Sequence, residues 1–224
     1  MAPRRRRLRD DGGRKEHNNQ MYGDKGLGHT EYPQVNSDFS WIEGTSCYCS
    51  DEAAARIRQA VRSLPLRAVH LLGSGDCHYV SLFWAEMVKE PFSLVLFDNH
   101  PDDQQTAFGG GMLSCGSWVA QARKLPLCKQ TVWIREASGF VLPDQDSVYL
   151  SVDLDVLSGE FARTNWDQGS MTMGELCGLV RRIKEARRII GIDICGGISE
   201  SQGARTCDLA INKDAVMTLC SLFA

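Results

Sequence analysis

The segment that decides the fold is Ser93-Leu94-Val95-Leu96-Phe97-Asp98-Asn99-His100-Pro101-Asp102, where an apolar run ends in Asp-x-His-x-Asp. The continuous apolar run is typical of a strand that is buried on both faces of a parallel sheet. Because alternate residues of an extended chain point the same way, Asp98, His100 and Asp102 should share one side. Two carboxylates and an imidazole brought together repel and desolvate one another unless a cation neutralises them. The segment therefore predicts a site for a hard or borderline divalent metal.

A second segment repeats this design. Ser147-Val148-Tyr149-Leu150-Ser151-Val152-Asp153-Leu154-Asp155 is another strand-like run, and it ends in Asp-x-Asp. Asp153 and Asp155 share a face by the same alternation. An isolated Asp-x-Asp is common in ordinary loops, but here two apolar strands both end in acids. Since α/β folds place their sites at the carboxyl ends of parallel strands, the two segments are expected to form one site.

Composition restricts the class of protein. The chain has 224 residues, 43% hydrophobic content and a net charge of −3, which suits one domain with a large core and favours neither a nucleic-acid binder nor a disordered chain. No apolar run approaches the ~18 residues of a membrane span, and no apolar segment follows the run Arg4 to Arg7 as a secretory signal requires. The nine cysteines are scattered without CxxC pairs, which indicates reduced thiols and a cytoplasmic location.

The domain organisation follows from local composition. Residues 1–20 are charged, polar and without periodicity, which predicts a disordered tail, and a single domain is expected over 21–224. His29 is expected to be a surface histidine rather than a ligand. A contact between the arginine run and nucleic acid is the other interpretation of the tail, although a run without aromatic residues is a weak signal for it.

The remaining elements alternate between strand and helix. Strands are predicted around 67–72, 93–97, 131–134, 147–153 and 189–194, and helices around 51–62, 79–89, up to 124, 172–187 and near the C-terminus. Thr172 and Glu175 form a capping box, and Asn212 is expected to cap the closing helix. This alternation predicts an α/β fold with a parallel sheet covered by helices on both faces.

A glycine-rich turn follows the first of the longer strands. The sequence Gly73-Ser74-Gly75-Asp76-Cys77-His78 permits a tight turn at a strand end, and it matches neither a dinucleotide fingerprint nor a Walker loop. His78 therefore stands where a third ligand-bearing loop would lie.

These motifs together resemble those of the arginase/agmatinase (ureohydrolase) superfamily, most of all its uncharacterised bacterial members. The family's Asp-x-His-x-Asp matches residues 98–102, and its Ser-x-Asp-x-Asp matches residues 151–155. Its Gly-Gly-Asp-His matches residues 73–78, with one residue inserted before His78. The similarity runs from about Val69 to the C-terminus, with the motifs in the family's order.

The resemblance implies a three-layer α/β/α fold with a mostly parallel sheet and a centre of two manganese ions. The ligands would be His78, Asp98, His100, Asp102, Asp153 and Asp155. On that pattern Asp98 and Asp153 bridge the ions, His78 and Asp102 complete one site, and His100 and Asp155 complete the other. Zinc or iron would also suit these ligands. The implied reaction is attack by a metal-bridging hydroxide on a C–N bond of a small guanidino- or amide-type metabolite.

Two departures from the family pattern bear on the substrate. Cys115, followed by Gly116, stands where arginases have a proton-shuttling histidine, so the candidate catalytic residues are Asp98, Cys115 and Asp153, with a packed thiol as the other role for Cys115. Gly196 replaces the glutamate that anchors the guanidinium. We therefore expect that arginine is not the substrate, unless Asp167 or Asp193 substitutes for the missing acid.

Two further hypotheses remain. In the first, the chain is a catalytically inactive metal-binding protein of the same fold. In the second, it is a nucleic-acid-associated protein, which the negative net charge disfavours. For the enzyme we expect a small-molecule substrate, no nucleic-acid partner and no membrane, and assembly into a homo-oligomer stays open.

Overall fold

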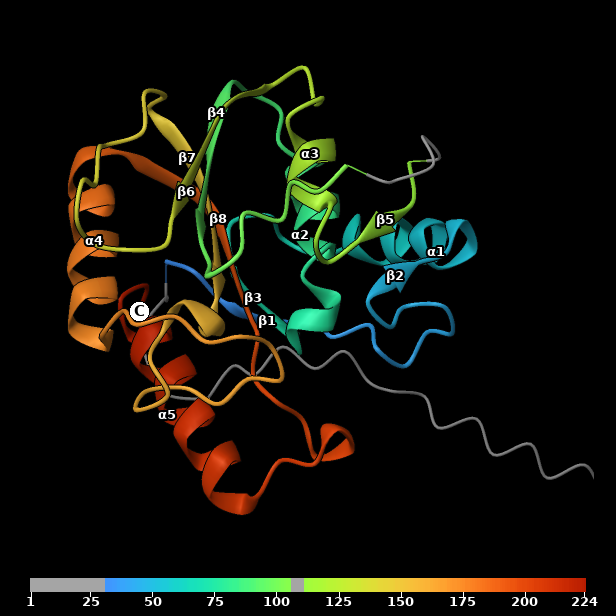
Figure 1. Ribbon diagram of the computed structural model, residues 1–224. Coiled ribbons are helices and arrows are strands. Elements are labelled where there is room, and N and C mark those ends of the chain that lie inside the picture. Colours follow the sequence, from blue (N-terminus) through green and yellow to red (C-terminus); the bar gives the residue numbers. More distant parts are fainter. Residues whose placement is uncertain (1–30, 106–110) are drawn as a thin grey trace, which may run out of the picture.

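The computed structural model describes residues 31–105 and 111–224, which are built around one six-stranded sheet (Figure 1). Every neighbouring pair in this sheet is parallel. In spatial order the strands are β1 (Gln34–Asn36), β3 (Val69–Gly73), β8 (Arg188–Cys195), β7 (Ser147–Asp153), β4 (Phe92–Phe97) and β6 (Cys128–Ile134). The carboxyl ends of β3, β4, β7 and β8 therefore meet at one edge, as predicted. The expected disordered tail and His29 lie outside the described residues.

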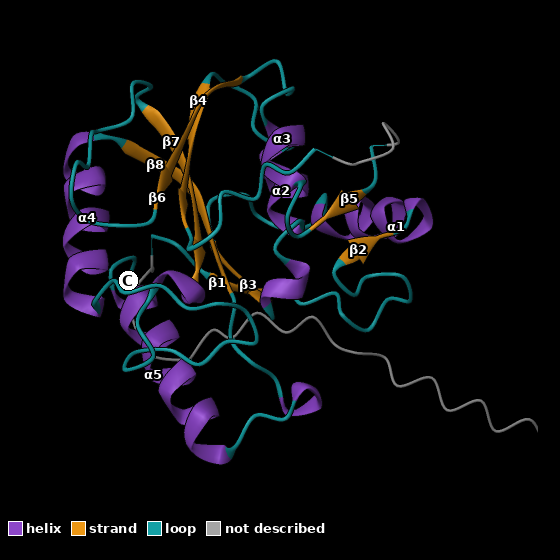
Figure 2. Ribbon diagram, viewed as in Figure 1, coloured by secondary structure: helices purple, strands orange, loops and turns teal. Residues whose placement is uncertain are grey.

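Helices cover both faces of the sheet (Figure 2). On one face lie α1 (Asp51–Val61), α2 (Val80–Ala85) and α3 (Trp118–Ala122), and on the other lie α4 (Met173–Ala186) and α5 (Thr206–Ser221). Each face has its own cluster of buried apolar side chains. The predicted three-layer α/β/α fold is confirmed.

The smaller elements lie around the sheet edge. An antiparallel pair, β2 (Tyr48–Cys49) and β5 (Leu113–Ser114), stands beside α1. Three single-turn helices follow β3, β7 and β8, at Gly75–Cys77, Leu154–Val156 and Glu200–Gln202. No helix among the described residues has the length and apolar character needed to cross a membrane.

The central strands are buried because they are apolar on both faces. All residues of β4 and of β7 are buried, including Ser93 and Ser151. This agrees with the continuous apolar runs, since a strand covered by helices on both sides has no solvent-facing positions. Asp98 and Asp153 consequently leave the sheet from its most enclosed part.

The capping box of α4 is confirmed, whereas the predicted cap of α5 is wrong. The Thr172 hydroxyl accepts from the Glu175 backbone N–H at 3.2 Å, and the Thr172 N–H donates to Glu175 Oε2 at 2.8 Å. Helix α5 begins at Thr206, so Asn212 lies inside it. The Asn212 amide instead binds the backbone N–H and C=O of Arg163, at 2.7 and 2.8 Å. A buried polar side chain must find partners, and here a distant loop supplies them.

Candidate metal centre

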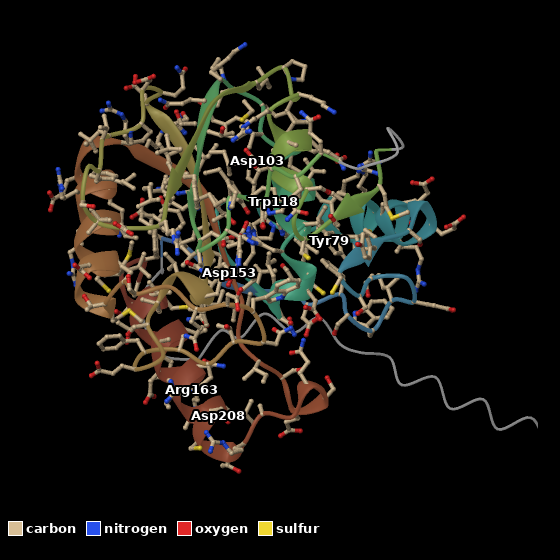
Figure 3. The ribbon with its side chains drawn as sticks, viewed as in Figure 1. Tyr79, Asp103, Trp118, Asp153, Arg163 and Asp208 are labelled. Atoms are coloured by element: carbon tan, nitrogen blue, oxygen red, sulfur yellow. The ribbon has the colours of Figure 1, made fainter. Side chains whose placement is uncertain are left out.

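The two acidic segments meet because β4 and β7 are neighbours. Phe97 pairs with Val152, so the residues that follow, Asp98 and Asp153, leave the sheet side by side. Figure 3 places Asp153 near the centre of the molecule, with Trp118 of α3 close by. A cavity of about 200 Å³ opens over these acids. The carboxylates of Asp98, Asp102, Asp153 and Asp155 are all buried at its base.

The first cluster is organised by His78. Its Nδ1 atom lies 3.1 Å from Asp98 Oδ2, 3.0 Å from Asp102 Oδ2 and 3.4 Å from Asp153 Oδ2. The His78 side chain is only 1% exposed. The single turn Gly75–Cys77 directs the chain from the end of β3 back over the acids, which brings His78 to them.

The second cluster is organised by His100. Its Nδ1 atom lies 2.9 Å from Asp155 Oδ2 and 3.6 Å from Asp98 Oδ1. Asp98 therefore faces His78 with one carboxylate oxygen and His100 with the other. The structure thus brings together the six residues that the resemblance implied as ligands.

The route of the chain through the first motif differs from the extended path that the alternation suggested. Strand β4 ends at Phe97, and the His100 N–H turns back to donate to Asp98 Oδ1 at 2.6 Å. Asp102 has a φ of 46°, in the left-handed region that costs a non-glycine residue of order 1–3 kcal/mol. Asp102 therefore reaches His78 through a turn, and such local strain is typical of functional sites.

Hydrogen bonds behind the clusters hold the side chains in place. His78 Nε2 lies 2.8 Å from Ser151 Oγ, and the Ser151 hydroxyl donates to Asp193 Oδ1 at 2.7 Å. The Trp118 indole N–H donates to Asp102 Oδ2 at 2.8 Å. The Asn99 backbone N–H donates to Asp155 Oδ1 at 3.0 Å. Three of the candidate ligands, His78, Asp102 and Asp155, are therefore oriented by a second group, as in metal sites generally.

The donor atoms of this cluster suit a cation, and the evidence for this is the environment of His78 Nδ1. Because Ser151 gives its proton to Asp193, its oxygen accepts from His78 Nε2–H, which leaves a lone pair on Nδ1 of the neutral ring. Nδ1 is buried and makes no properly directed hydrogen bond, although three carboxylate oxygens lie within 3.0–3.4 Å of it. Those oxygens are acceptors as well. A cation, or in its absence a proton, is what such a set of atoms requires.

The pKa values of the clustered side chains indicate the same requirement for positive charge. Burial, together with repulsion from Asp153 and Asp98, raises the pKa of the Asp155 carboxyl. Contacts with Asp98 and Asp155 raise the pKa of His100. Burial and the Asp98 charge raise the pKa of Asp153 to about 6. The pair of Asp155 and His100 therefore retains a proton at neutral pH.

A pH dependence of metal binding follows. A proton held by the pair of Asp155 and His100 must leave when an ion takes its place, so the affinity should increase with pH. Between about pH 6 and 8 we expect a rise of roughly tenfold per pH unit for each proton displaced. Calorimetric titration with Mn²⁺ in buffers of different ionisation enthalpy measures the number of protons released on binding. A pH-independent affinity, with no proton released, would contradict this description of the site.

The contact between Trp118 and Asp102 allows a matched test of ligand orientation. Replacing Trp118 with Phe removes the hydrogen bond to Asp102 and should lower Mn²⁺ affinity about 10- to 100-fold. Trp84→Phe is the control, because Trp84 is equally buried but its indole N–H has no hydrogen-bond partner among residues 31–105 and 111–224. Both variants should lose some stability, and only Trp118→Phe should lose metal affinity. Equal affinities in the two variants would show that Trp118 only fills space.

The other residues named from the sequence lie in different surroundings. Cys115 is half-buried and lines the cavity, and burial together with the neighbouring Cys47 raises its pKa to about 12. Asp193 is fully buried behind Ser151, which separates it from the cavity. Asp167 is exposed and is absent from the cavity lining. Neither acid is therefore placed to contact a ligand in the cavity, since Asp193 is needed as the acceptor for Ser151.

Two residues of this centre were missed in the sequence. Cys195, the last residue of β8, donates its S–H to Asp153 Oδ2 at 3.2 Å. Ser151 connects His78 to Asp193, although only its place in the family motif was noted. No local pattern indicated either contact, because the register that pairs Ser151 with Asp193 and Asp153 with Cys195 arises only when β7 and β8 lie side by side.

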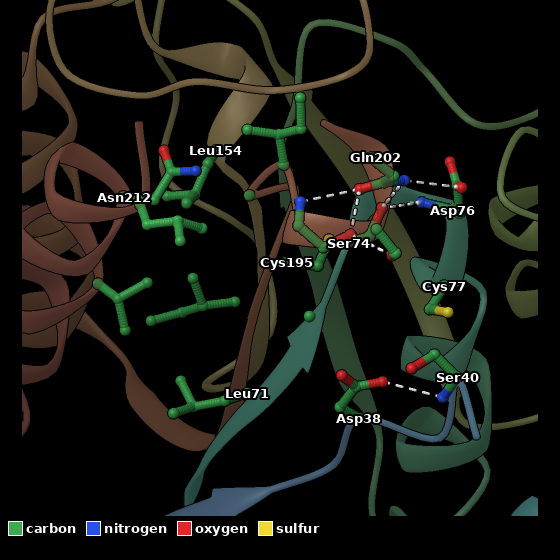
Figure 4. Close-up of a pocket in the computed structure, with 18 of the residues that line it drawn as sticks. Asp38, Ser40, Leu71, Ser74, Asp76, Cys77, Leu154, Cys195, Gln202 and Asn212 are labelled. Atoms are coloured by element: carbon green, nitrogen blue, oxygen red, sulfur yellow. Dashed lines mark hydrogen bonds between the residues drawn. The ribbon is translucent and has the colours of Figure 1, made fainter. Parts of the chain in front are cut away.

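A second cavity, of about 650 Å³, lies between α5 and the ends of β3 and β8 (Figure 4). On one side Gln202 donates to Ser74 Oγ at 2.9 Å and to Asp76 Oδ2 at 3.0 Å. None of the six candidate ligands lines this cavity. The smaller cavity, which contains the buried acids and imidazoles, is therefore the candidate site for chemistry.

Comparisons with known proteins agree with the architecture. No family model matches the chain. An uncharacterized protein from Thermotoga maritima is 33% identical over 144 residues, which is 57% of this chain and 57% of that protein. The chain thus spans little more than half the length of this curated relative.

Solved structures give broader matches. The arginase from Bacillus caldovelox is similar over 82% of this chain and 79% of its own, with 18% identity and a TM-score of 0.59. A putative agmatinase from Clostridium difficile is similar over 78% and 75%, with 18% identity and a TM-score of 0.56. The formimidoylglutamase from Bacillus subtilis is similar over 76% and 66%, with 18% identity and a TM-score of 0.55.

The chain therefore has an α/β/α fold with a parallel sheet and a buried cluster of acids and imidazoles at the carboxyl edge. More narrowly, its fold is that of the arginases, agmatinases and formimidoylglutamases, the ureohydrolases. The resemblance stated from the motifs is confirmed at the level of the fold.

Proposed function

We propose that this chain is a divergent ureohydrolase, a binuclear metal hydrolase that cleaves a C–N bond in a small cytoplasmic metabolite. The observation that carries this proposal is the pair of clusters that share Asp98, one around the unpartnered His78 Nδ1 and the other around His100. Such a pair suits two adjacent ions with a common ligand.

Each ion would have its own histidine. His78 and Asp102 would hold the first ion, His100 and Asp155 the second, and Asp98 and Asp153 would contact both. This oxygen-rich set with two imidazoles suits Mn²⁺, and it is compatible with Zn²⁺ or Fe²⁺. When bound, a pair of divalent ions supplies an acidified water as nucleophile and stabilises the negative charge that develops on the attacked group.

The cavity lining favours an uncharged substrate. Among the described residues that line it, every carboxylate belongs to the proposed ligand set. A buried guanidinium needs a carboxylate of its own to replace lost hydration, and the lining offers instead Gln104, Ser114 and the half-exposed Trp166 and Tyr48. These groups suit a neutral, amide-type C–N group that carries a small substituent.

The experiment is elemental analysis after Mn²⁺ loading, followed by a screen of guanidino and amide compounds. We expect two ions per chain, turnover that a chelator abolishes, and no useful urea release from arginine or agmatine. Without an acid for the guanidinium, the affinity for arginine should be at least about a hundredfold weaker than in an enzyme that has one. Urea released from arginine, at a rate that Asp153→Ala eliminates, would contradict this choice of substrate.

A metal-binding protein without catalysis is the second candidate function. Cys115 favours it, because a thiol with a pKa raised to about 12 is a poor proton shuttle near neutral pH. Two bound ions with no turnover of any compound in the screen would support this function.

A further inference from the structure

Cys195 places a thiol directly against the first metal cluster. Its side chain is buried, and Sγ lies 3.2 Å from Asp153 Oδ2. Sγ, Asp153 Oδ2 and a His78 ring nitrogen all lie within 4.8 Å of one another. Cys195 also lines the larger cavity (Figure 4). The ligand set implied by the family resemblance leaves this thiol without a role.

The backbones of three strands, β3, β7 and β8, bring Cys195 close to Asp153. Cys195 pairs with Asp153 of β7 on one side and with Gly73 of β3 on the other. Gly196 follows with a φ of +100°, and its N–H donates to the Gly73 C=O at 3.0 Å. Because Gly196 has no Cβ, the end of β8 can lie against the Asp153 carboxylate, and this brings the thiol to the cluster.

A second, independent observation indicates what Cys195, Asp153 and His78 could bind together. His78 is 1% exposed, and its Nδ1 atom, which faces Asp153 Oδ2 at 3.4 Å, makes no directed hydrogen bond. The S–H group is only a weak donor, and it satisfies one carboxylate oxygen without satisfying the imidazole. A cation bound by nitrogen, oxygen and sulfur satisfies all three.

We infer that Cys195 is a thiolate ligand of the ion held by His78, so that this chain has an asymmetric centre with sulfur on one side. The inference rests on the proposed function and extends its ligand set. On coordination the S–H proton leaves to solvent and a metal–sulfur bond forms, because a coordinating thiol is deprotonated. His100, Asp155 and Asp98 give the second ion a sulfur-free set.

The consequence is metal selectivity. Thiolate ligands favour Zn²⁺, Co²⁺ and Fe²⁺, whereas carboxylates suit Mn²⁺. The His78 site should therefore prefer Zn²⁺ or Fe²⁺, and the His100 site should remain suited to Mn²⁺. We therefore expect a mixed pair of ions, because Cys195 adds a sulfur ligand that neither acidic segment contains.

Cobalt substitution tests the inference without an activity assay. The Co²⁺-loaded wild type should show a sulfur-to-cobalt charge-transfer band in the near ultraviolet. Cys195→Ser should lose this band, keep visible d–d bands from the remaining ligands, and lower the ratio of Zn²⁺ to Mn²⁺ affinity at least about tenfold. Cys77→Ser is the matched control, because Cys77 is also buried beside His78 but its S–H donates to the Thr45 C=O at 3.8 Å.

A second variant keeps the test valid if Cys195→Ser does not fold. A chain with Cys47, Cys77 and Cys115 all changed to Ser keeps Cys195 as the thiol beside the cluster, and it should retain the band. Cobalt bound in the wild type without the band, or a band lost in this triple variant, would overturn the cysteine ligand alone. Absence of bound cobalt from the wild type would overturn the proposed function as well.

Discussion

Replacing Asp153 with alanine should remove both metal ions and all turnover. Asp153 Oδ2 faces His78 Nδ1 at 3.4 Å and accepts from Cys195 at 3.2 Å, while Oδ1 accepts from the Asp155 N–H at 2.9 Å. The carboxylate thus contacts the first cluster and positions Asp155 of the second. We expect a loss of metal affinity of at least about 100-fold at each site.

The metal-free Asp153→Ala chain should still fold. The charges of Asp153 and Asp98 repel Asp155 and contribute to its raised pKa, so removing one charge from this buried group relieves repulsion. Asp103→Ala is the control, because Asp103 is next to Asp102 in the loop after β4 but pairs with Arg123 at 2.8 Å instead of with the cluster. Elemental analysis and thermal unfolding measure both effects. Two ions retained by Asp153→Ala at wild-type affinity would refute the bridging role.

Replacing Gly196 with alanine should destabilise the metal-free protein and impair metal binding. A Cβ atom at this position would lie 2.7 Å from the Leu154 backbone nitrogen and 2.8 Å from Asp153 Cγ, and closer still to Oδ1. The φ of +100° is itself unfavourable for alanine. Strain and overpacking together should cost about 3 kcal/mol, or roughly 6–12 °C in Tm for a chain of this size.

Gly178→Ala is the matched control for this substitution. Gly178 lies in α4 with nothing within 4 Å of its added Cβ, so alanine there should be neutral or stabilise by up to about 1 kcal/mol. Thermal unfolding of both metal-free variants, followed by Mn²⁺ titration, makes the comparison. Equal Tm values for the two variants would show that the end of β8 can move away from Asp153. For the same steric reason, glutamate at position 196 should not create an arginase, because it would displace Asp153, which we propose as a bridging ligand.

The sequence alone determined the sheet and the place of its site. The apolar runs that end at Phe97 and Val152 required buried parallel strands, because no exposed strand is apolar on both faces. Acids at the ends of such strands must meet at one edge of the sheet, which is why Asp98 and Asp153 were assigned to one centre before any distance was known. The capping box at Thr172 is a local pattern that can be recognised from the sequence, and the structure contains it.

The tertiary structure alone decided the contacts between residues that are distant in the chain. The link from His78 through Ser151 to Asp193, the thiol of Cys195 on Asp153 and the use of Asn212 by Arg163 join residues 42 to 73 positions apart in the chain. Local periodicity reports which face of a strand a residue occupies, but not which strand lies beside it or in what register. The left-handed turn at Asp102 and the close approach at Gly196 likewise depend on neighbours that only the folded chain supplies.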